Sequence, residues 1–213
     1  MASGNGSNFQ ALIDAIESRE VRGLKIAALV SDTPGARAIA RATRHGIPSH
    51  ILPCPEGARR GTEARALFDA RLASIVASFR PDFVLMLGWM RLLGQGFLRQ
   101  FPGKVINLHP ALPGTFPGTR AIERAYEAFH RGEISASGVM LHLVPDEGVD
   151  SGPVLKVAEI PLRNGETLEE FEASVHAEEH RLVVELAREL GRGGGLSAPR
   201  SDISQQCTLE KEC

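Results

Sequence analysis

The sequence has few of the features that mark disulfide-rich, membrane-spanning or nucleic-acid-binding proteins. Its 213 residues include only three cysteines, an odd number with no Cys-x-x-Cys pair, which argues against a disulfide framework and a zinc site. No apolar run approaches the ~20 residues that span a bilayer, and no charged and apolar segments mark a signal peptide. The formal net charge of −2 provides no overall basic field for nucleic acid. We therefore expect a cytoplasmic protein without a membrane or nucleic-acid partner.

Short apolar runs alternate with segments of helical periodicity through the first half of the chain. The expected strands lie at 24–31, 48–52 and 82–87, and the expected helices lie at 36–45 and 62–79. This alternation is typical of a parallel sheet that is covered by helices on both faces. The run at 24–31 is almost continuously apolar, as expected of a parallel strand buried on both sides.

The second half of the chain predicts an antiparallel hairpin and a long final helix. Strands are expected at 137–144 and 153–160, and the acidic loop that joins them is short enough for a hairpin. A helix is expected over 167–190. Its first residues fit a capping box, in which Thr167 and Glu170 each bond the other's backbone.

These elements together predict a single α/β domain. It would have three layers, with a mostly parallel sheet, helices on both faces and an antiparallel C-terminal strand. The polar, patternless sequence that follows predicts a disordered tail, so we place the domain at 1–190 and the tail at 191–213.

The glycine-rich segment at 3–8 opens onto a segment with helical periodicity. Ser7 or Asn8 could cap that helix, and the free N–H groups at a helix start form an anion site. Phosphate loops of this kind normally follow a strand, yet only Met1 and Ala2 precede this one. Either that strand is absent or the true start lies upstream. A flexible N-terminus before an ordinary capped helix is the competing interpretation.

The segment 104–110 reads as a buried strand that delivers polar side chains to its carboxyl end. Asn107 and His109 are two residues apart, so an extended strand points both to the same face. Pro110 has no N–H and should end regular pairing. Strand ends of open α/β sheets commonly hold ligands, although such residues also satisfy backbone groups without any further role.

His142 and Asp150 are the other polar residues that the sequence singles out. A carboxylate beside His109 would raise the pKa of the imidazole, and an imidazolium beside the Asn107 amide would offer two donors to an oxyanion. No Gly-x-Ser-x-Gly is present and Cys54 has no supporting context, so we expect direct transfer between two bound substrates. A metal site of two histidines and Asp150 is less favoured, because no short-spaced ligand pair accompanies it.

Four segments together carry a resemblance to a known family: Ser-Gly-Asn-Gly-Ser-Asn (3–8), Gly-Trp-Met-Arg-Leu-Leu (88–93), Asn-Leu-His-Pro (107–110) and Asp-Glu-Gly-Val-Asp-Ser-Gly-Pro (146–153). The Asn-x-His pair and the Asp resemble the pattern of the 10-formyltetrahydrofolate transferase and hydrolase superfamily. The Ser-Gly-x-Gly-Ser-Asn loop narrows the resemblance to the phosphoribosylglycinamide formyltransferase family, and the resemblance runs over about residues 2–190.

The resemblance implies a formyl transfer from 10-formyltetrahydrofolate to the glycyl amine of 5-phosphoribosylglycinamide, without a metal. Asn107 would bind the formyl oxygen, His109 would stabilise the oxyanion and act as general acid, and Asp150 would orient His109. The other implied contacts are Gly6, Ser7, Asn8, His176 and Glu179 for the nucleotide, and Arg65, Met90, Arg91, Leu92, Leu93 and Asn107 for the folate.

Several of these residues also have structural interpretations. Trp89 fits a core aromatic, and His142 and His180 fit packing roles. Arg65 could be either a solvated helix charge or a ligand contact. Two other functions are compatible with the resemblance. One is a 10-formyltetrahydrofolate hydrolase of the wider superfamily, and the other is a catalytically impaired homologue that only binds folate or nucleotide.

The sequence departs from the family pattern at its start, where an apolar strand would precede the loop at 3–8. We therefore expect low stability or weak activity unless the start lies upstream. The loop after His109 reads Pro-Ala-Leu-Pro-Gly-Thr-Phe-Pro-Gly and should have only local effects. A monomer and a homodimer are both compatible with the sequence.

Overall fold

The computed structural model describes residues 1–193, and most of the predicted tail, 194–213, lies outside the described residues. Within the described part, no helix is both long and apolar enough to cross a membrane. The predicted alternation of elements is confirmed. Their order is α1 (Ser7–Glu17), β1 (Leu29–Ser31), α2 (Arg37–Arg44), β2 (Ser49–Ile51), α3 (Glu63–Ser78), β3 (Val84–Met86), α4 (Gln95–Leu98), β4 (Val105–His109), α5 (Ala121–His130), β5 (Ala136–Leu143), β6 (Val154–Pro161) and α6 (Leu168–Gly191).

The strands form two sheets. β1 and β2 pair in parallel, and the other four strands form a sheet in the order β3-β4-β5-β6. β3 and β4 are parallel, whereas β5 is antiparallel to both β4 and β6. The predicted hairpin is therefore confirmed. The strand that is reversed in the sheet is β5, however, so that β6 runs in the same direction as β4.

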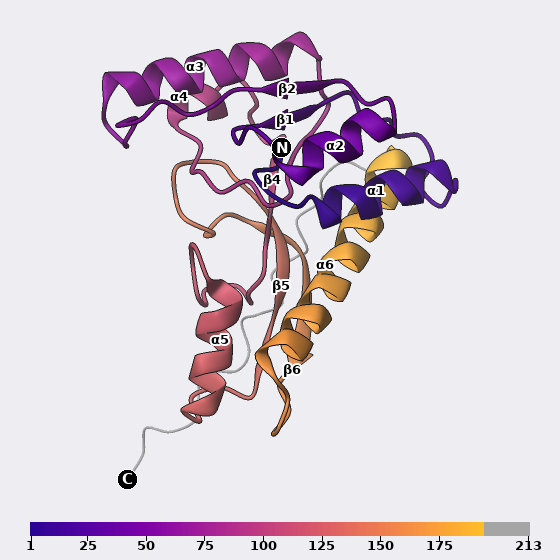
Figure 1. The fold of residues 1–213 in the computed structure, drawn as a ribbon, viewed down its shortest axis with the longest axis vertical. Helices are drawn as coiled ribbons and strands as arrows, with labels where there is room; N and C mark the ends of the chain where they lie inside the picture. The colour runs from indigo at the N-terminus through magenta and orange to yellow at the C-terminus, as the bar shows by residue number, and fades with distance from the viewer. Residues whose placement is uncertain (194–213) are drawn as a thin grey trace, which may run out of the picture.

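Helices cover both faces of the strands, which confirms the three-layer arrangement. One cluster of buried side chains joins α1 and α6 to β4, β5 and β6, and Figure 1 shows α6 lying along the last two strands. A second cluster joins α3 and α4 to β1 and β3. Ile106 and Leu108 of β4 belong to the first cluster and Val105 to the second, so alternate residues of β4 face opposite layers.

Of the described residues, those at the start of the chain lie between β1 and β3. The backbone N–H of Ala2 donates to the carbonyl oxygen of Val30 at 3.1 Å, and the N–H of Leu87 donates to that of Met1 at 2.9 Å. Residues 1–3 therefore bond to segments of both sheets, although they are not themselves assigned to a strand. In Figure 1 the N-terminus lies beside β1, above β4.

The run at 24–31 was expected to be a strand along its whole length, and this prediction was wrong in extent. Only Leu29–Ser31 forms β1, because strand structure requires a paired neighbour. Its partner β2 extends no further, and within residues 1–193 no strand pairs with residues 24–28 on the other side. The lack of a paired neighbour among these residues thus shortens a segment whose composition favours a strand.

The helix ends show which local signals were read correctly. The capping box of Thr167 and Glu170 is present at the start of α6, as predicted. The start of α1 differs, because its N-cap is Gly6 rather than Ser7 or Asn8. Gly6 has a φ of 72°, and a Cβ there would lie 2.8 Å from the Cβ of Ala38, so only glycine fits between α1 and α2.

Candidate active site

β4 carries Asn107 and His109 on the face of Val105, which confirms that the two side chains point the same way. His109 is buried, and Asn107 is partly buried between β3 and β5. Because β5 is antiparallel to β4, its His142 lies directly opposite Asn107. An amide and two imidazoles are thus gathered at the carboxyl end of β4 by strand pairing alone.

Asp150, in the loop between β5 and β6, joins these groups. Its Oδ1 accepts from Asn107 Nδ2 at 2.9 Å, its Oδ2 accepts from the Gly118 N–H at 2.8 Å, and His109 Nδ1 lies 3.3 Å from Oδ2. Burial acts to raise the pKa of the Asp150 carboxyl. The His142 and His109 imidazoles, which lie 3.5 and 3.3 Å from its two oxygens, and the hydrogen bond from the Gly118 N–H together bring the pKa below its usual value. Asp150 is therefore a stable anion inside the cluster.

The orientation of His142 follows from its own strand. Its Nδ1 lies 2.8 Å from the carbonyl oxygen of Leu143, which makes Nδ1 the donor in the neutral ring. Its Nε2 can then accept from Asn107 Nδ2 at 3.2 Å. Both amide hydrogens of Asn107 are therefore engaged, one by His142 and one by Asp150. His142, first interpreted as a packing residue, belongs to the polar network.

His109 differs from the expectation in its pKa. Both ring nitrogens face oxygen atoms, because Nε2 lies 3.2 Å from the carbonyl of Phe116 while Nδ1 faces Asp150. Burial lowers the pKa of His109, and the Asp150 carboxylate offsets this effect only in part. The predicted raised pKa was wrong, because the sequence shows the nearby carboxylate but not the burial of His109, which has the larger effect on the pKa. A lowered pKa makes the imidazolium a stronger acid.

The loop at 88–94 lies beside this cluster and is held by three side chains. Ser3 Oγ accepts from the N–H of Met90 at 3.0 Å, and Arg91 Nε donates to Asp32 Oδ2 at 2.5 Å. Trp89 is buried, in agreement with its interpretation as a core aromatic, whereas Met90 is 69% exposed. The start of the chain and the end of β1 therefore set the path of this loop.

The third contact comes from Arg65, which is neither solvated nor free. Its side chain is only 14% exposed, its Nε lies 2.9 and 3.0 Å from the two carboxylate oxygens of Asp69, and it also donates to the carbonyl oxygen of Leu92. Asp69 is buried and also accepts from the N–H of Gly94, and burial raises its pKa despite Arg65. The pair acts as a clamp on the loop at 88–94.

Three carboxylates around this loop were missed by the sequence reasoning. Asp69 lies four residues after Arg65 on one helix, a spacing that could have revealed the pair. Asp32 follows β1 directly, at a strand end. Glu147 accepts from the N–H of Gln95 at 2.9 Å, a contact between distant segments for which the sequence gives no signal.

The glycine-rich loop and α6 bring the predicted nucleotide-binding residues together. Asn8 Nδ2 donates to Glu179 Oε2 at 3.1 Å, and His176 Nδ1 lies 2.8 Å from the same oxygen. Glu179 and Asn8 are buried, while the His176 side chain is 51% exposed. The hydrogen bond to Glu179 raises the pKa of His176. Gly6 and Ser7 lie at the start of α1, where helix N–H groups have no carbonyl partner within the helix.

A small cleft connects the loop at 88–94 with the polar cluster. It has a volume of about 30 Å³, and its lining includes Leu92, Leu93, Asn107, His142 and Asp150. The structure therefore brings part of the predicted folate site to the predicted catalytic residues. Met90, Arg91 and Arg65 do not line this cleft.

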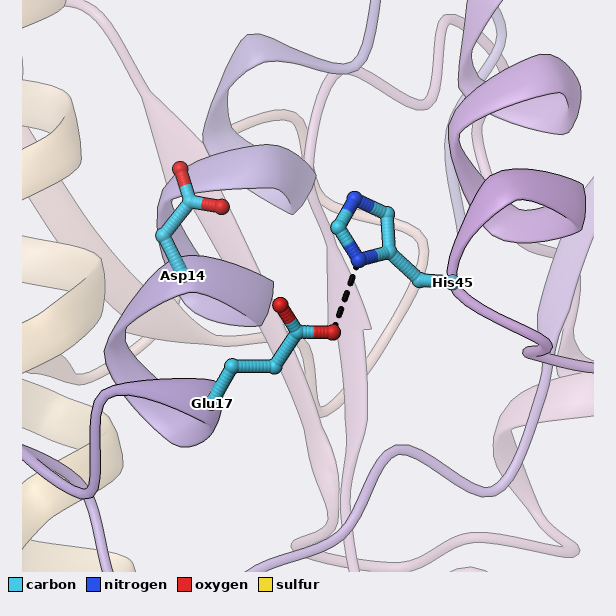
Figure 2. Close-up of side chains that lie close together, drawn as sticks. All are labelled: Asp14, Glu17 and His45. Atoms are coloured by element: carbon cyan, nitrogen blue, oxygen red, sulfur yellow. Dashed lines mark hydrogen bonds and ion pairs between the residues drawn. The ribbon is translucent and has the colours of Figure 1, made fainter.

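One group of possible metal ligands lies elsewhere, on the surface between α1 and the end of α2. It consists of Asp14, Glu17 and His45 (Figure 2). His45 Nδ1 is 2.7 Å from Glu17, and its Nε2 is 3.1 Å from Gln10 Nε2. Both ring nitrogens therefore have protein partners, and Asp14 in turn accepts from Gln10 at 2.8 Å. This group is accounted for as a surface hydrogen-bond network.

Comparison with known proteins identifies the family of the chain. Residues 1–187 match the Formyl transferase family model. The phosphoribosylglycinamide formyltransferase of Dictyostelium discoideum is 37% identical over 193 residues, covering 87% of this chain and 93% of the relative. That of Bacillus subtilis is 33% identical and covers 89% and 91%. The solved glycinamide ribonucleotide transformylase 1 from Geobacillus kaustophilus has a TM-score of 0.78 at 36% identity, covering 89% and 95%. The chain therefore belongs to the formyl transferase family.

Proposed function

We propose that this protein is a phosphoribosylglycinamide formyltransferase of de novo purine synthesis. It moves the formyl group of 10-formyltetrahydrofolate to the glycyl amine of 5-phosphoribosylglycinamide. The observation that carries this function is the Asp150 carboxylate, which is bonded to Asn107 and lies against His109 beside the loop at 88–94. The names of the relatives support the choice of substrates.

The chemistry needs no covalent enzyme intermediate. The neutral glycyl amine attacks the formyl carbon, a new C–N bond forms, and the formyl oxygen becomes an oxyanion. One N–H of Asn107 leaves His142 and the Nε2–H of His109 leaves the Phe116 carbonyl to donate to that oxyanion. Such a donor is typically worth ~10²–10³-fold in rate. The proton lost by the amine reaches N10 of the folate through His109 and water held by Asp150, and the C–N10 bond breaks. Tetrahydrofolate and the formylated nucleotide result.

The nucleotide lies along the glycine-rich loop in this proposal. Its phosphate takes the free N–H groups of Gly6, Ser7 and Asn8 at the start of α1. Glu179 and His176 on α6 contact the rest of the nucleotide. The contact of Glu179 with Asn8 supports this arrangement, because one buried carboxylate then joins the two nucleotide-binding segments.

The pterin lies along the loop at 88–94, where Met90, Arg91, Leu92 and Leu93 contact it largely through backbone groups. The small cleft between Leu92, Leu93 and Asn107 supports this position, because it opens toward the groups that react. Arg65 acts on the folate site through the Leu92 carbonyl, which it already binds.

The decisive experiment incubates the full chain with both substrates and follows tetrahydrofolate release. Release that requires 5-phosphoribosylglycinamide supports the transferase. Release at an equal rate without the nucleotide would indicate a 10-formyltetrahydrofolate hydrolase, and binding of both substrates without turnover would indicate a catalytically impaired homologue. We further propose that the protein works in the cytoplasm and that it is a monomer or homodimer. Light scattering of the purified chain tests the oligomeric state.

A further inference from the structure

Residues 116–118, which lie between β4 and α5, contact both His109 and Asp150. The carbonyl oxygen of Phe116 lies 3.2 Å from His109 Nε2, and the N–H of Gly118 donates to Asp150 Oδ2 at 2.8 Å. A displacement of this segment by about 1 Å would break both contacts, because a separation beyond ~3.5 Å is no longer a hydrogen bond. The position of the segment therefore matters for both groups.

Phe116 has a backbone conformation that its own chemistry disfavours. Its φ is 44°, in the left-handed region that a bulky residue rarely adopts. Pro117 follows directly, and the residue before a proline is restricted toward extended conformations. A conformation of this kind persists only where the surrounding contacts hold it in place. Contacts from outside residues 116–118 must therefore fix the position of the Phe116 carbonyl.

Arg124, near the start of α5, supplies those contacts. Its Nη2 donates to the carbonyl oxygens of Phe116 and Pro117, each at 2.7 Å, and its guanidinium lies 6.0 Å from the centroid of the Phe116 ring. Within residues 1–193 its one other hydrogen-bond partner is the carbonyl oxygen of Arg120. In this part of the chain the half-buried side chain thus holds the backbone without neutralisation by a carboxylate.

The Phe116 carbonyl oxygen is shared between Arg124 and His109. Its two lone pairs allow it to accept from both side chains at once. When the Nε2–H of His109 turns to the formyl oxygen, this carbonyl would have no partner in the absence of Arg124. Loss of the last donor to a partly buried acceptor is costly, because the acceptor then lacks both protein and water partners. Arg124 therefore lowers the cost of releasing His109 to the substrate.

The charge of Arg124 acts in the same direction. Burial is the main cause of the lowered pKa of His109, and the charged or titratable groups that face the ring are Asp150, His142 and Arg124. Asp150 raises this pKa, whereas His142 and Arg124 lower it. The cation thus makes the imidazolium a stronger acid, and it also favours negative charge on an oxygen bound beside His109.

We propose that Arg124 is a positioning residue of the reaction, which holds residues 116–118 against His109 and Asp150 and keeps the Phe116 carbonyl bonded while His109 donates to the formyl oxygen. This inference rests on the proposed formyl transfer. In this role Arg124 touches neither substrate. Its loss should therefore act on the transition state, which lowers kcat and leaves both KM values unchanged.

Two substitutions at position 124 test this role. Arg124→Met keeps the aliphatic part of the side chain but removes its donors and its charge. It should lower kcat by at least ~10-fold, with both KM values within ~2-fold of the original. Arg124→Lys keeps the charge, and its single nitrogen has enough donors for both carbonyls. It should restore kcat to within ~3-fold of the unsubstituted chain.

A matched control and a second readout separate this role from a general effect on the helix. Arg131→Gln changes an exposed arginine at the other end of α5, which pairs with Glu133, and should leave kcat and both KM values unchanged. NMR of the His109 ring measures its pKa without turnover. The pKa should rise in Arg124→Met, because a cation that opposes protonation is lost, and should stay constant in Arg124→Lys and Arg131→Gln.

Three outcomes would count against this role. Near-normal kcat in Arg124→Met would overturn the proposal. Equal losses of kcat and Tm in the Met and Lys variants would show that Arg124 is only a structural contact, which also overturns it. If the unsubstituted chain releases no tetrahydrofolate, the proposed function fails instead. An unchanged pKa of His109 in Arg124→Met would overturn the role of Arg124 whether or not the chain is active.

Discussion

The two sheets differ in how completely their strands are paired. From β4 to β6, neighbouring strands bond over longer stretches, and the pairing of β5 with β6 runs from Ala136 to His142, whereas β3 pairs with β4 only over Val84–Met86. β1 and β2 pair only over Leu29–Ser31 and Ser49–Ile51. The difference shows that one chain can place its reacting groups on well-paired strands while the neighbouring part of the same fold encloses a cavity of about 530 Å³, lined mainly by residues 23–30 and 79–85.

The two regions also serve different parts of the candidate site. Asn107 and His109 lie on β4, which pairs with β5, and Asp150 accepts a hydrogen bond from Asn107, so these three residues are positioned by the strands β4–β6. The glycine-rich loop continues directly from residues 1–3, which are held between the sheets. A defect in the region where residues 1–3 bond to β1 and to the segment after β3, here called the incomplete edge, should therefore affect nucleotide binding before it affects the catalytic groups. Substitutions on the two sides can separate these effects.

The largest expected difference comes from the same kind of truncation in the two regions. Leu141→Ala removes a fully buried side chain from β5 and should lower the free energy of unfolding by about 2–5 kcal/mol. Ile26→Ala, at the cavity wall, should cost less than ~1 kcal/mol, because the side chain already borders empty space. Urea denaturation of both variants measures the contrast, and similar losses would contradict it.

The next effect is a pH dependence of stability that comes from the Met1 amine at the incomplete edge. Burial lowers the pKa of the Met1 amine from 8.0 to about 5. Between these values the unfolded chain binds the proton and the folded chain does not, so the free energy of unfolding should rise from pH 5 to pH 8. The gain should be on the order of 2–4 kcal/mol.

The control for this pH effect is the Nα-acetylated chain, prepared from protein whose mass shows that Met1 is retained. Acetylation removes the titrating group and should remove this part of the slope. His109, whose pKa is also lowered, contributes stability that is gained as the pH rises toward its ordinary value and lost at lower pH. It titrates in both chains and cancels in the difference. Parallel slopes would show that the amine is not buried.

The region of β4–β6, which positions Asn107, His109 and Asp150, is tested by measuring activity. His109→Ala and Asp150→Asn should each lower kcat by at least ~10²-fold, because one removes the acid and the other its negatively charged partner. Thermal unfolding should show that both variants remain folded. Arg71→Gln, on the exposed side of α3, is the matched control and should keep full activity. Near-normal turnover in His109→Ala would refute the proposed roles.

The sequence predicted those features that depend on neighbours along the chain. The period of two placed Asn107 and His109 on one face, and the spacing of Thr167 and Glu170 identified the capping box. It failed where a distant segment decides the outcome. Residues 24–28 are apolar enough for a strand but pair with no other strand within residues 1–193, and the pKa of His109 depends on how deeply the fold buries its ring. Composition contains neither fact.

The smallest expected effect concerns Asp69, which holds the loop at 88–94 from the α3 side. Asp69→Asn keeps one oxygen for the Gly94 N–H but loses the two-oxygen contact with Arg65. The freed guanidinium should hold the Leu92 carbonyl less firmly and raise the KM for the folate about 5-fold, roughly 1 kcal/mol, with little change in kcat.

A purely structural role for Asp69 would give a different pattern. Loss of packing would lower the Tm and kcat together and leave the KM for the folate unchanged. The substitution also removes a carboxyl whose burial raises its pKa, so the Tm should not fall by more than a few degrees. Because Asp69 and Arg65 lie on the α3 side of the loop, the KM for 5-phosphoribosylglycinamide should stay constant. A change in that KM instead would mean that the clamp acts through residues 1–3 and the incomplete edge.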